Sequence, residues 1–194
     1  MNAKAIDERT TTTGVHPLKF TLWLLIMSII MMFAAFTSAY IVRREEGNWL
    51  EFNLPNGLVL NTVFIVLSSI TMQWAYISAK KDNLINLKIS LLITFILGSV
   101  FLVGQWNVWG ELVINKIFFG GPTANPSGSF MYVLTGVHGF HLITGLLFLL
   151  IVLISAFQYK VHSKNLVRME LCTTYWHFLS ALWVYLYVFL AVYH

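Results

Sequence analysis

Five long runs of apolar residues constrain this chain more than any other feature of its sequence. Each run is about 20 residues or longer, the length that an α-helix needs to cross a bilayer, and no interior carries an acidic or basic side chain. The runs cover residues 18–42, 57–79, 87–109, 130–159 and 171–193. Because lipid offers no partner for backbone polar groups, continuous runs of this length indicate helices. The sequence therefore predicts an all-α integral membrane protein, a bundle of five transmembrane helices.

Composition agrees with a chain that lies in lipid. Hydrophobic residues make up 58% of the chain and charged residues only 10%, whereas soluble domains carry about 25% charged residues. The single cysteine, Cys172, excludes an internal disulfide, a cysteine-based zinc site and an iron–sulfur cluster. We interpret the net charge of +4 as a signal of membrane topology carried by Lys and Arg, and we expect no nucleic-acid partner.

The positions of Lys and Arg predict how the chain is oriented. Alternate connections place nine of them on one side of the membrane: Lys4, Arg9, Lys19, Lys80, Lys81, Lys88, Lys160, Lys164 and Arg168. Only Arg43, Arg44 and Lys116 fall on the other side. Because cytoplasmic flanks are enriched in Lys and Arg, we expect the N-terminus in the cytoplasm and the C-terminus outside.

The domain organisation is simple. Residues 1–16 are polar and rich in threonine, and we expect a flexible cytoplasmic tail there. Residues 17–194 are interpreted as a single five-helix membrane domain. The segment from Gly110 to Ser129 is the longest connection, with glycines and prolines that favour turns.

Polar side chains inside the apolar runs form stripes at helical spacing. His138, His141 and Gly145 share one face of the fourth run, and Thr173, His177, Ser180, Val184 and Tyr187 share one face of the fifth. The second run carries Asn61, Ser68 and Ala75, and the first carries Ser28, Ala35 and Ser38. Small and polar residues are typical of helix–helix contacts in membranes. We interpret the stripes, including their histidines, as packing faces.

Two alternatives for the histidines stay open. A membrane haem could be held between His177 and either His138 or His141. A proton relay is the other alternative, although relays generally include intramembrane carboxylates, and no run contains one. A complete haem–copper centre would need six histidines, and His16, His162 and His194 lie in loops or at the end of the chain.

The tryptophans divide between interfaces and spans. Trp49, Trp106 and Trp109 fall near the predicted membrane surfaces, where aromatic side chains are enriched. Trp23, Trp74, Trp176 and Trp183 lie within runs. We expect lipid or helix contacts for all of them, with Trp23, Trp74, Trp106 and Trp109 as the candidate lipid contacts. A lipid-binding cleft is the functional form of that expectation.

Three segments resemble one known family. These are "SFMYVLTGVHGFHLITG" from Ser129 to Gly145, "YWHFLSALWVYLY" from Tyr175 to Tyr187 and "LPNGLVLNTVFIVLSS" from Leu54 to Ser69. The T-G-x-H-G-x-H pattern of the first and the W-H-F stretch of the second are characteristic. The chain resembles subunit III of the haem–copper respiratory oxidases, the cytochrome c oxidase subunit III family, in its short five-helix bacterial form.

The resemblance implies a non-catalytic subunit of a proton-pumping aerobic terminal oxidase in the bacterial inner membrane. Such a subunit carries no redox centre, packs on subunit I, which holds haem and copper, and holds phospholipids in a V-shaped cleft. It supports proton uptake and turnover stability. Partners implied are subunit I, the other oxidase subunits, phospholipids and a larger respiratory supercomplex. The electron donor stays open between cytochrome c and a quinol, and a haem-binding membrane cytochrome b is the less favoured alternative.

The resemblance also assigns structural roles and shows two departures. Its motif and packing residues here are Thr135, Gly136, His138, Gly139, His141, Gly145, Trp176, His177, Ser180 and Trp183. Many members carry a Glu after a serine in the helix that matches the first run, where this chain has Ile29 after Ser28. Many also carry an Asp three residues after the W-H-F histidine, where this chain has Ser180. Both differences remove buried carboxylates.

Overall fold

The computed structural model describes residues 17–158 and 166–193, and these residues form five α-helices and no strand. The helices are α2 (Pro17–Glu45), α3 (Gly57–Lys80), α4 (Leu84–Ile114), α5 (Pro126–Phe157) and α6 (Val167–Tyr193). All five are long and apolar enough to cross a membrane, which confirms the predicted fold class. The predicted tail, Tyr159 at the end of the fourth run, and His16, His162 and His194 lie outside the described residues.

Local sequence signals set where two of these helices begin. Asn83 accepts a hydrogen bond from the backbone N–H of Asn86 at 3.2 Å and caps α4. Asn125 accepts from the backbone N–H of Ser127 at 3.1 Å and caps α5. Pro126 follows Asn125 as the first residue of α5, where its missing N–H costs no helical hydrogen bond.

The helices extend beyond the predicted apolar runs. α4 ends at Ile114 instead of residue 109, and α5 begins at Pro126 instead of residue 130. The hydrocarbon thickness decides which residues must be apolar, but it does not end a helix, so polar turns continue outside the lipid. The connection between α4 and α5 is therefore residues 115–125, shorter than predicted.

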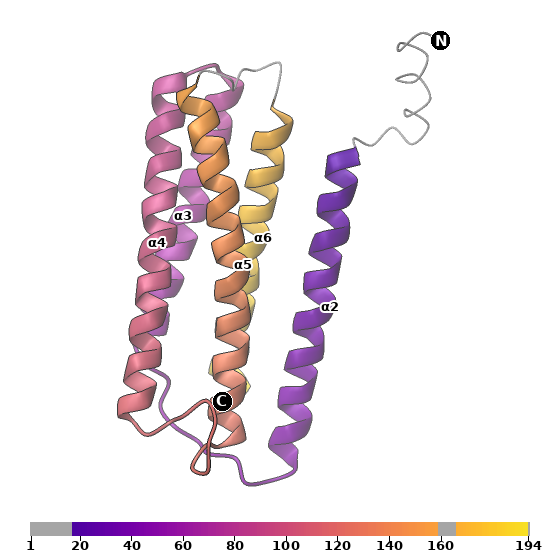
Figure 1. Ribbon diagram of the computed structural model, residues 1–194, viewed down its shortest axis with the longest axis vertical. Coiled ribbons are helices and arrows are strands. Elements are labelled where there is room, and N and C mark those ends of the chain that lie inside the picture. Colours follow the sequence, from indigo (N-terminus) through magenta and orange to yellow (C-terminus); the bar gives the residue numbers. More distant parts are fainter. Residues whose placement is uncertain (1–16, 159–165, 194) are drawn as a thin grey trace.

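Four helices form a bundle and the first stands beside it (Figure 1). α3 and α4 are antiparallel neighbours joined by the short turn from Lys81 to Asn83. Within the described chain α2 contacts only α5 and α6, and it is the helix with the smallest buried share.

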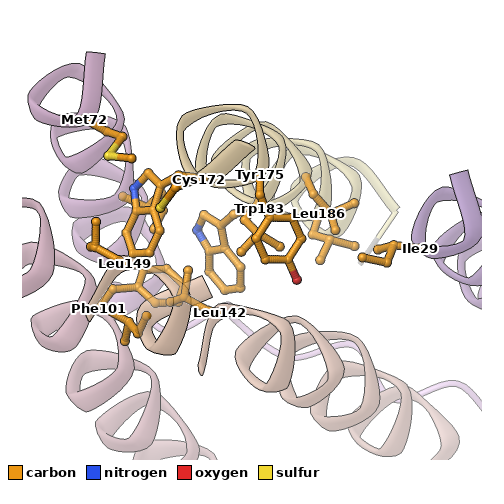
Figure 2. Packing of buried hydrophobic residues seen from close by; sticks show 14 of the residues in the cluster. Ile29, Met72, Phe101, Leu142, Leu149, Cys172, Tyr175, Trp183 and Leu186 are labelled. Carbon is orange, nitrogen blue, oxygen red and sulfur yellow. The ribbon is translucent and has the colours of Figure 1, made fainter. Parts of the chain in front are cut away.

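Large side chains fill the bundle interior. Figure 2 shows Met72 of α3, Phe101 of α4, Leu142 of α5 and Trp183 of α6 directed into the space between these helices. The outward faces carry many exposed aliphatic and aromatic side chains. An exposed apolar exterior suits a surface covered by lipid or by other membrane helices.

Candidate functional site

The motif of α5 lies on a face that packs against α6. A Cβ atom placed on Gly145 would lie 2.8 Å from Leu179 Cδ1 and 3.6 Å from the ring of Trp176. Gly145 is buried, and so is Gly139, although a Cβ on Gly139 would meet no atom within 4 Å. Gly136 is intermediate, with the ring of Trp109 3.7 Å from its Cβ position. Of these three glycines, Gly145 is the one whose missing side chain permits close packing.

Trp176 links α6 to two further helices. Its side chain is 1% exposed, and its indole N–H donates to Ser68 Oγ of α3 at 3.1 Å. On α4, a Cβ atom placed on Gly98 would lie 2.7 Å from the Trp176 ring. The indole therefore fills a space that depends on a glycine of α4 and a serine of α3.

Trp183 occupies an equivalent position two turns later on α6. Its indole N–H donates to Thr62 Oγ1 of α3 at 3.0 Å. Its ring centroid lies 4.7 Å from that of Phe101 on α4 and 5.0 Å from that of His138 on α5. Four helices therefore meet at this side chain.

The two histidines of the α5 motif have different surroundings. His138 is 0% exposed, lies beside Phe101 and Trp183, and makes no hydrogen bond to the described residues through either ring nitrogen. His141 is partly buried, and its Nδ1 lies 2.8 Å from the Val137 carbonyl oxygen of its own helix. Since a carbonyl only accepts, Nδ1 carries the hydrogen. The ring of His141 faces Phe33 of α2 at 6.0 Å.

His177 bonds to α3. Its Nε2 lies 3.0 Å from Gln73 Oε1 and its Nδ1 lies 2.6 Å from Ser69 Oγ. Because the amide oxygen only accepts, Nε2 donates to Gln73 and Nδ1 accepts from the Ser69 hydroxyl. The haem alternative requires His177 to face His138 or His141, and both nitrogens of His177 are instead bonded to α3.

Thr135 and Ser180 make hydrogen bonds within the protein. Trp109 of α4 donates its indole N–H to Thr135 Oγ1 at 3.0 Å, and Thr135 donates to the Met131 carbonyl at 2.7 Å. Ser180 donates to the Trp176 carbonyl at 3.0 Å, within α6. Ile29, the other position where many family members carry a carboxylate, is 2% exposed.

The candidate lipid contacts are unequally exposed. Trp106, Trp23 and Trp74 have exposed fractions of 72%, 57% and 45%. Trp109 is partly buried through its contact with α5.

The polar stripes also differ in burial. Asn61, Ser68 and Ala75 of α3 are buried. The stripe of Ser28, Ala35 and Ser38 on α2 is exposed. The prediction that this α2 stripe packs on a neighbouring helix is not met within the described chain, because α2 turns its other face, with Ile29 and Phe33, towards the bundle.

A cleft lies beside α2 and has a polar and an apolar part. The polar part is a hollow of about 380 Å³ lined by Lys19, Leu22, Trp23, Gln73, Tyr76, Glu170, Leu171, Thr173, Thr174 and His177. The apolar part is a hollow of about 320 Å³ lined by Leu18, Thr21, Leu22, Leu25, Thr144, Phe148, Leu171 and Tyr175. Leu22 of α2 and Leu171 of α6 line both parts. We use the word cleft for these two hollows together.

Charged groups join the helices across the polar part. Lys19 Nζ lies 2.5 Å from Glu170 Oε2, and the Tyr76 hydroxyl donates to Glu170 Oε1 at 3.2 Å. Thr173 lines the same hollow, is 6% exposed, and its hydroxyl has no hydrogen-bond partner in the described chain.

Sequence reasoning missed this group, because Lys19 and Glu170 lie at opposite ends of the chain. The available signal was weak: each is a charged residue at the edge of an apolar run.

No three His, Cys, Asp or Glu side chains of residues 17–158 and 166–193 gather closely enough to hold a metal ion. The described residues form packing faces around Trp176, Trp183 and Gly145 and a cleft beside α2.

Comparison with known proteins gives a consistent result. The family model described as "Cytochrome c oxidase subunit III" matches residues 2–194. The chain is similar to cytochrome bo(3) ubiquinol oxidase subunit 3 of Buchnera aphidicola subsp. Schizaphis graminum, with 29% identity over 88% of this chain and 90% of that protein. It is also similar to cytochrome c oxidase subunit 3 of Corynebacterium diphtheriae, with 28% identity over 82% and 80% of the two chains. Cytochrome c oxidase subunit 3 of Papio hamadryas is 30% identical over 92% of this chain and 70% of its own length.

Proposed function

Because the chain belongs to the cytochrome c oxidase subunit III family, we propose that it is a non-catalytic subunit of a proton-pumping aerobic terminal oxidase. The observation that carries the proposal is the match of the family model to residues 2–194. In this proposal oxygen is reduced at haem and copper in partner subunits, and this chain carries no redox centre. It acts by packing on subunit I and by supporting proton uptake and stability during turnover.

The surface of the described helices supports a role in assembly. α2 contacts only two of the other four helices, and its outward face carries exposed apolar and small residues. Membrane helices associate through close packing at small residues. Subunit I is the main partner that we propose, with the other oxidase subunits and a larger respiratory supercomplex as further partners.

The cleft supports a second part of the proposal, the binding of a phospholipid. The Lys19 ammonium, the Thr173 hydroxyl and the Gln73 amide are hydrogen-bond donors on the polar part. Phosphate and ester oxygens of a phospholipid are acceptors of matching chemistry. The apolar part, on the other side of Leu22 and Leu171, offers side chains that suit an acyl chain. Trp23, on the rim of the polar part, is the candidate lipid contact closest to this site.

The proposed location is the bacterial inner membrane, with the N-terminus in the cytoplasm and the C-terminus outside. The bias in Lys and Arg supports this orientation. In this orientation the Lys19–Glu170 end of the cleft lies on the cytoplasmic side.

Cytochrome c is the electron donor that we propose, and a quinol is the alternative, because similar subunits occur in proteins named as cytochrome c oxidase and as ubiquinol oxidase. The test is to purify the complex through an affinity tag on this chain and identify its subunits. Oxygen consumption is then measured with reduced cytochrome c and with a short-chain quinol as separate donors.

We expect a haem–copper subunit to co-purify and reduced cytochrome c to support oxygen uptake. Activity with the quinol alone would move the complex to the quinol-oxidase branch. Purification of the chain without any oxidase subunit would contradict the proposed function.

A further inference from the structure

One level of the bundle interior collects polar side chains from neighbouring helices. Gln105 of α4 is 2% exposed and His138 of α5 is 0% exposed. Gln105 lies one turn after Phe101, whose ring is 5.9 Å from His138, and one turn before Trp109, which bonds to Thr135. The contacts of α4 with α5 on either side of Gln105 therefore place it between the levels of Thr135 and His138.

Neither side chain has its hydrogen bonds completed by residues that the structure describes. Gln105 Oε1 lies 3.5 Å from Asn61 Nδ2 of α3, at the long limit for a hydrogen bond. Gln105 Nε2 and both ring nitrogens of His138 are buried and make no hydrogen bond to the described residues. Buried polar groups in proteins almost always bond to protein or to ordered water.

The surrounding residues restrict which ligand can meet these groups. The ring centroid of Trp183 of α6 lies 5.0 Å from that of His138, with the two rings tilted, and the Trp183 N–H is already donated to Thr62 of α3. Phe101 lies edge-on to His138 from α4. These rings give His138 no further oxygen or nitrogen partner. A ligand that meets both groups has to donate and to accept, because neutral imidazole has one donor and one acceptor and the Gln105 nitrogen only donates.

We propose that Gln105 and His138 bind ordered water inside the four-helix bundle. A water oxygen accepts from Gln105 Nε2–H, and one of its hydrogens is donated to the unprotonated nitrogen of His138. Such a water completes hydrogen bonds between α4 and α5 at the level where Asn61 joins α4 to α3. Buried waters of this kind typically make about three hydrogen bonds. The site is independent of the cleft and of the identity of the electron donor.

The direct test is a high-resolution electron cryomicroscopy map of the assembled oxidase. We expect a density peak within hydrogen-bond distance of both Gln105 Nε2 and a ring nitrogen of His138. A well-resolved pair of side chains with no peak between them, or with a direct bond from the Gln105 amide to the imidazole, would overturn the proposal. The map is recorded on the unmodified complex, so it tests for the water even if substituted chains fail to assemble.

A variant series tests the same site through stability. Gln105→Leu and His138→Phe each remove one partner of the water, and we expect each to lower the temperature at which heating releases the chain from the complex. In the double variant this temperature should fall by less than the sum of the two single decreases. The reason is that the second substitution removes a group that the first left unpaired. Asn107→Leu, on the exposed side of the same helix, is the matched control and should shift the temperature little. Losses that add fully would contradict a shared water.

Discussion

The ion pair between Lys19 and Glu170 joins the beginning of α2 to the beginning of α6, with Nζ and Oε2 2.5 Å apart. Their side chains are 42% and 31% exposed, and exposed pairs contribute only about 0.2–1 kcal/mol to stability. Both residues line the polar part of the cleft. We therefore expect the pair to affect the position of α2 at the cleft more than the stability of the whole bundle.

The first prediction concerns lipid retention. Glu170→Gln removes the charge that holds both Lys19 and the Tyr76 hydroxyl. We expect the complex to assemble normally and to retain fewer phospholipid molecules after detergent purification, as counted by mass spectrometry of extracted lipid. Glu111→Gln removes an exposed carboxylate of α4 that does not line the cleft and should leave the lipid count unchanged. Equal lipid counts in both variants would contradict the proposal that the cleft binds phospholipid.

The second prediction concerns orientation. Lys81 and Thr123 are exposed and lie in the connections after α3 and after α4, on opposite sides of the membrane. In a Cys172→Ser background, an impermeant thiol reagent added to spheroplasts should label Thr123→Cys and leave Lys81→Cys unlabelled. Permeabilised cells should label both. Labelling at position 81 but not at position 123 in sealed cells would reverse the proposed topology.

The five helices were predictable because hydrocarbon imposes one simple condition, a long apolar run with its backbone bonded internally. The ends of α4 and α5 were not, since a helix continues wherever caps and prolines allow, as at Asn125 and Pro126. Spacing predicts that residues share a face but not what that face meets. The stripe at Ser28 and Ala35 is exposed, although spacing alone suggested a contact.

The candidate site was predictable only in part for a similar reason. Spacing placed His138 and His141 together on one face, yet one ring enters the bundle and the other faces Phe33 of α2. α5 contacts both α6 and α2, so the His138 ring meets Trp183 of α6 and the His141 ring meets Phe33 of α2. The contact of Lys19 with Glu170 depends on how α2 docks, and a single sequence read by itself carries no signal for it.

The third prediction concerns haem. Both nitrogens of His177 are bonded to α3, and His138 lies between aromatic rings. We therefore expect the isolated chain, reconstituted in detergent with added haem, to show no stoichiometric haem absorption. A bound haem that disappears in both His138→Ala and His177→Ala would favour the membrane cytochrome b alternative.

The fourth prediction concerns Trp176. Trp176→Phe removes the bond to Ser68 and leaves the indole space beside Gly98 partly empty. Lost buried hydrogen bonds and small cavities each cost on the order of 1 kcal/mol or more. The variant should therefore lower the thermal midpoint of the complex measurably. Trp106→Phe, at a side chain that is 72% exposed, is the control and should change the midpoint little. Equal shifts in the two variants would show that the buried contacts of Trp176 add no particular stability.

The fifth prediction concerns endurance during turnover, and it uses Gly145. Leucine at position 145 would overlap Leu179, whose Cδ1 lies 2.8 Å from the Cβ position, and press on Trp176. Overpacking of this kind costs about 1–3 kcal/mol, so α5 and α6 should separate slightly and hold their partner subunit less firmly. Gly110→Leu on α4 is the matched control, since Gly110 is exposed and has no atom within 4 Å of its Cβ position.

A non-catalytic subunit can affect oxygen reduction only through the structure and the proton access of its partner. For Gly145→Leu we therefore expect initial oxygen consumption close to that of the unmodified complex, followed by faster loss of activity during sustained turnover, while Gly110→Leu should decay at the unmodified rate. Oxygen consumption is recorded over many turnovers, with haem content and subunit composition measured before and after. If the initial rate of Gly145→Leu fell to zero while haem content and subunit composition stayed normal, the chain would take part in the chemistry itself, and the accessory role would be wrong.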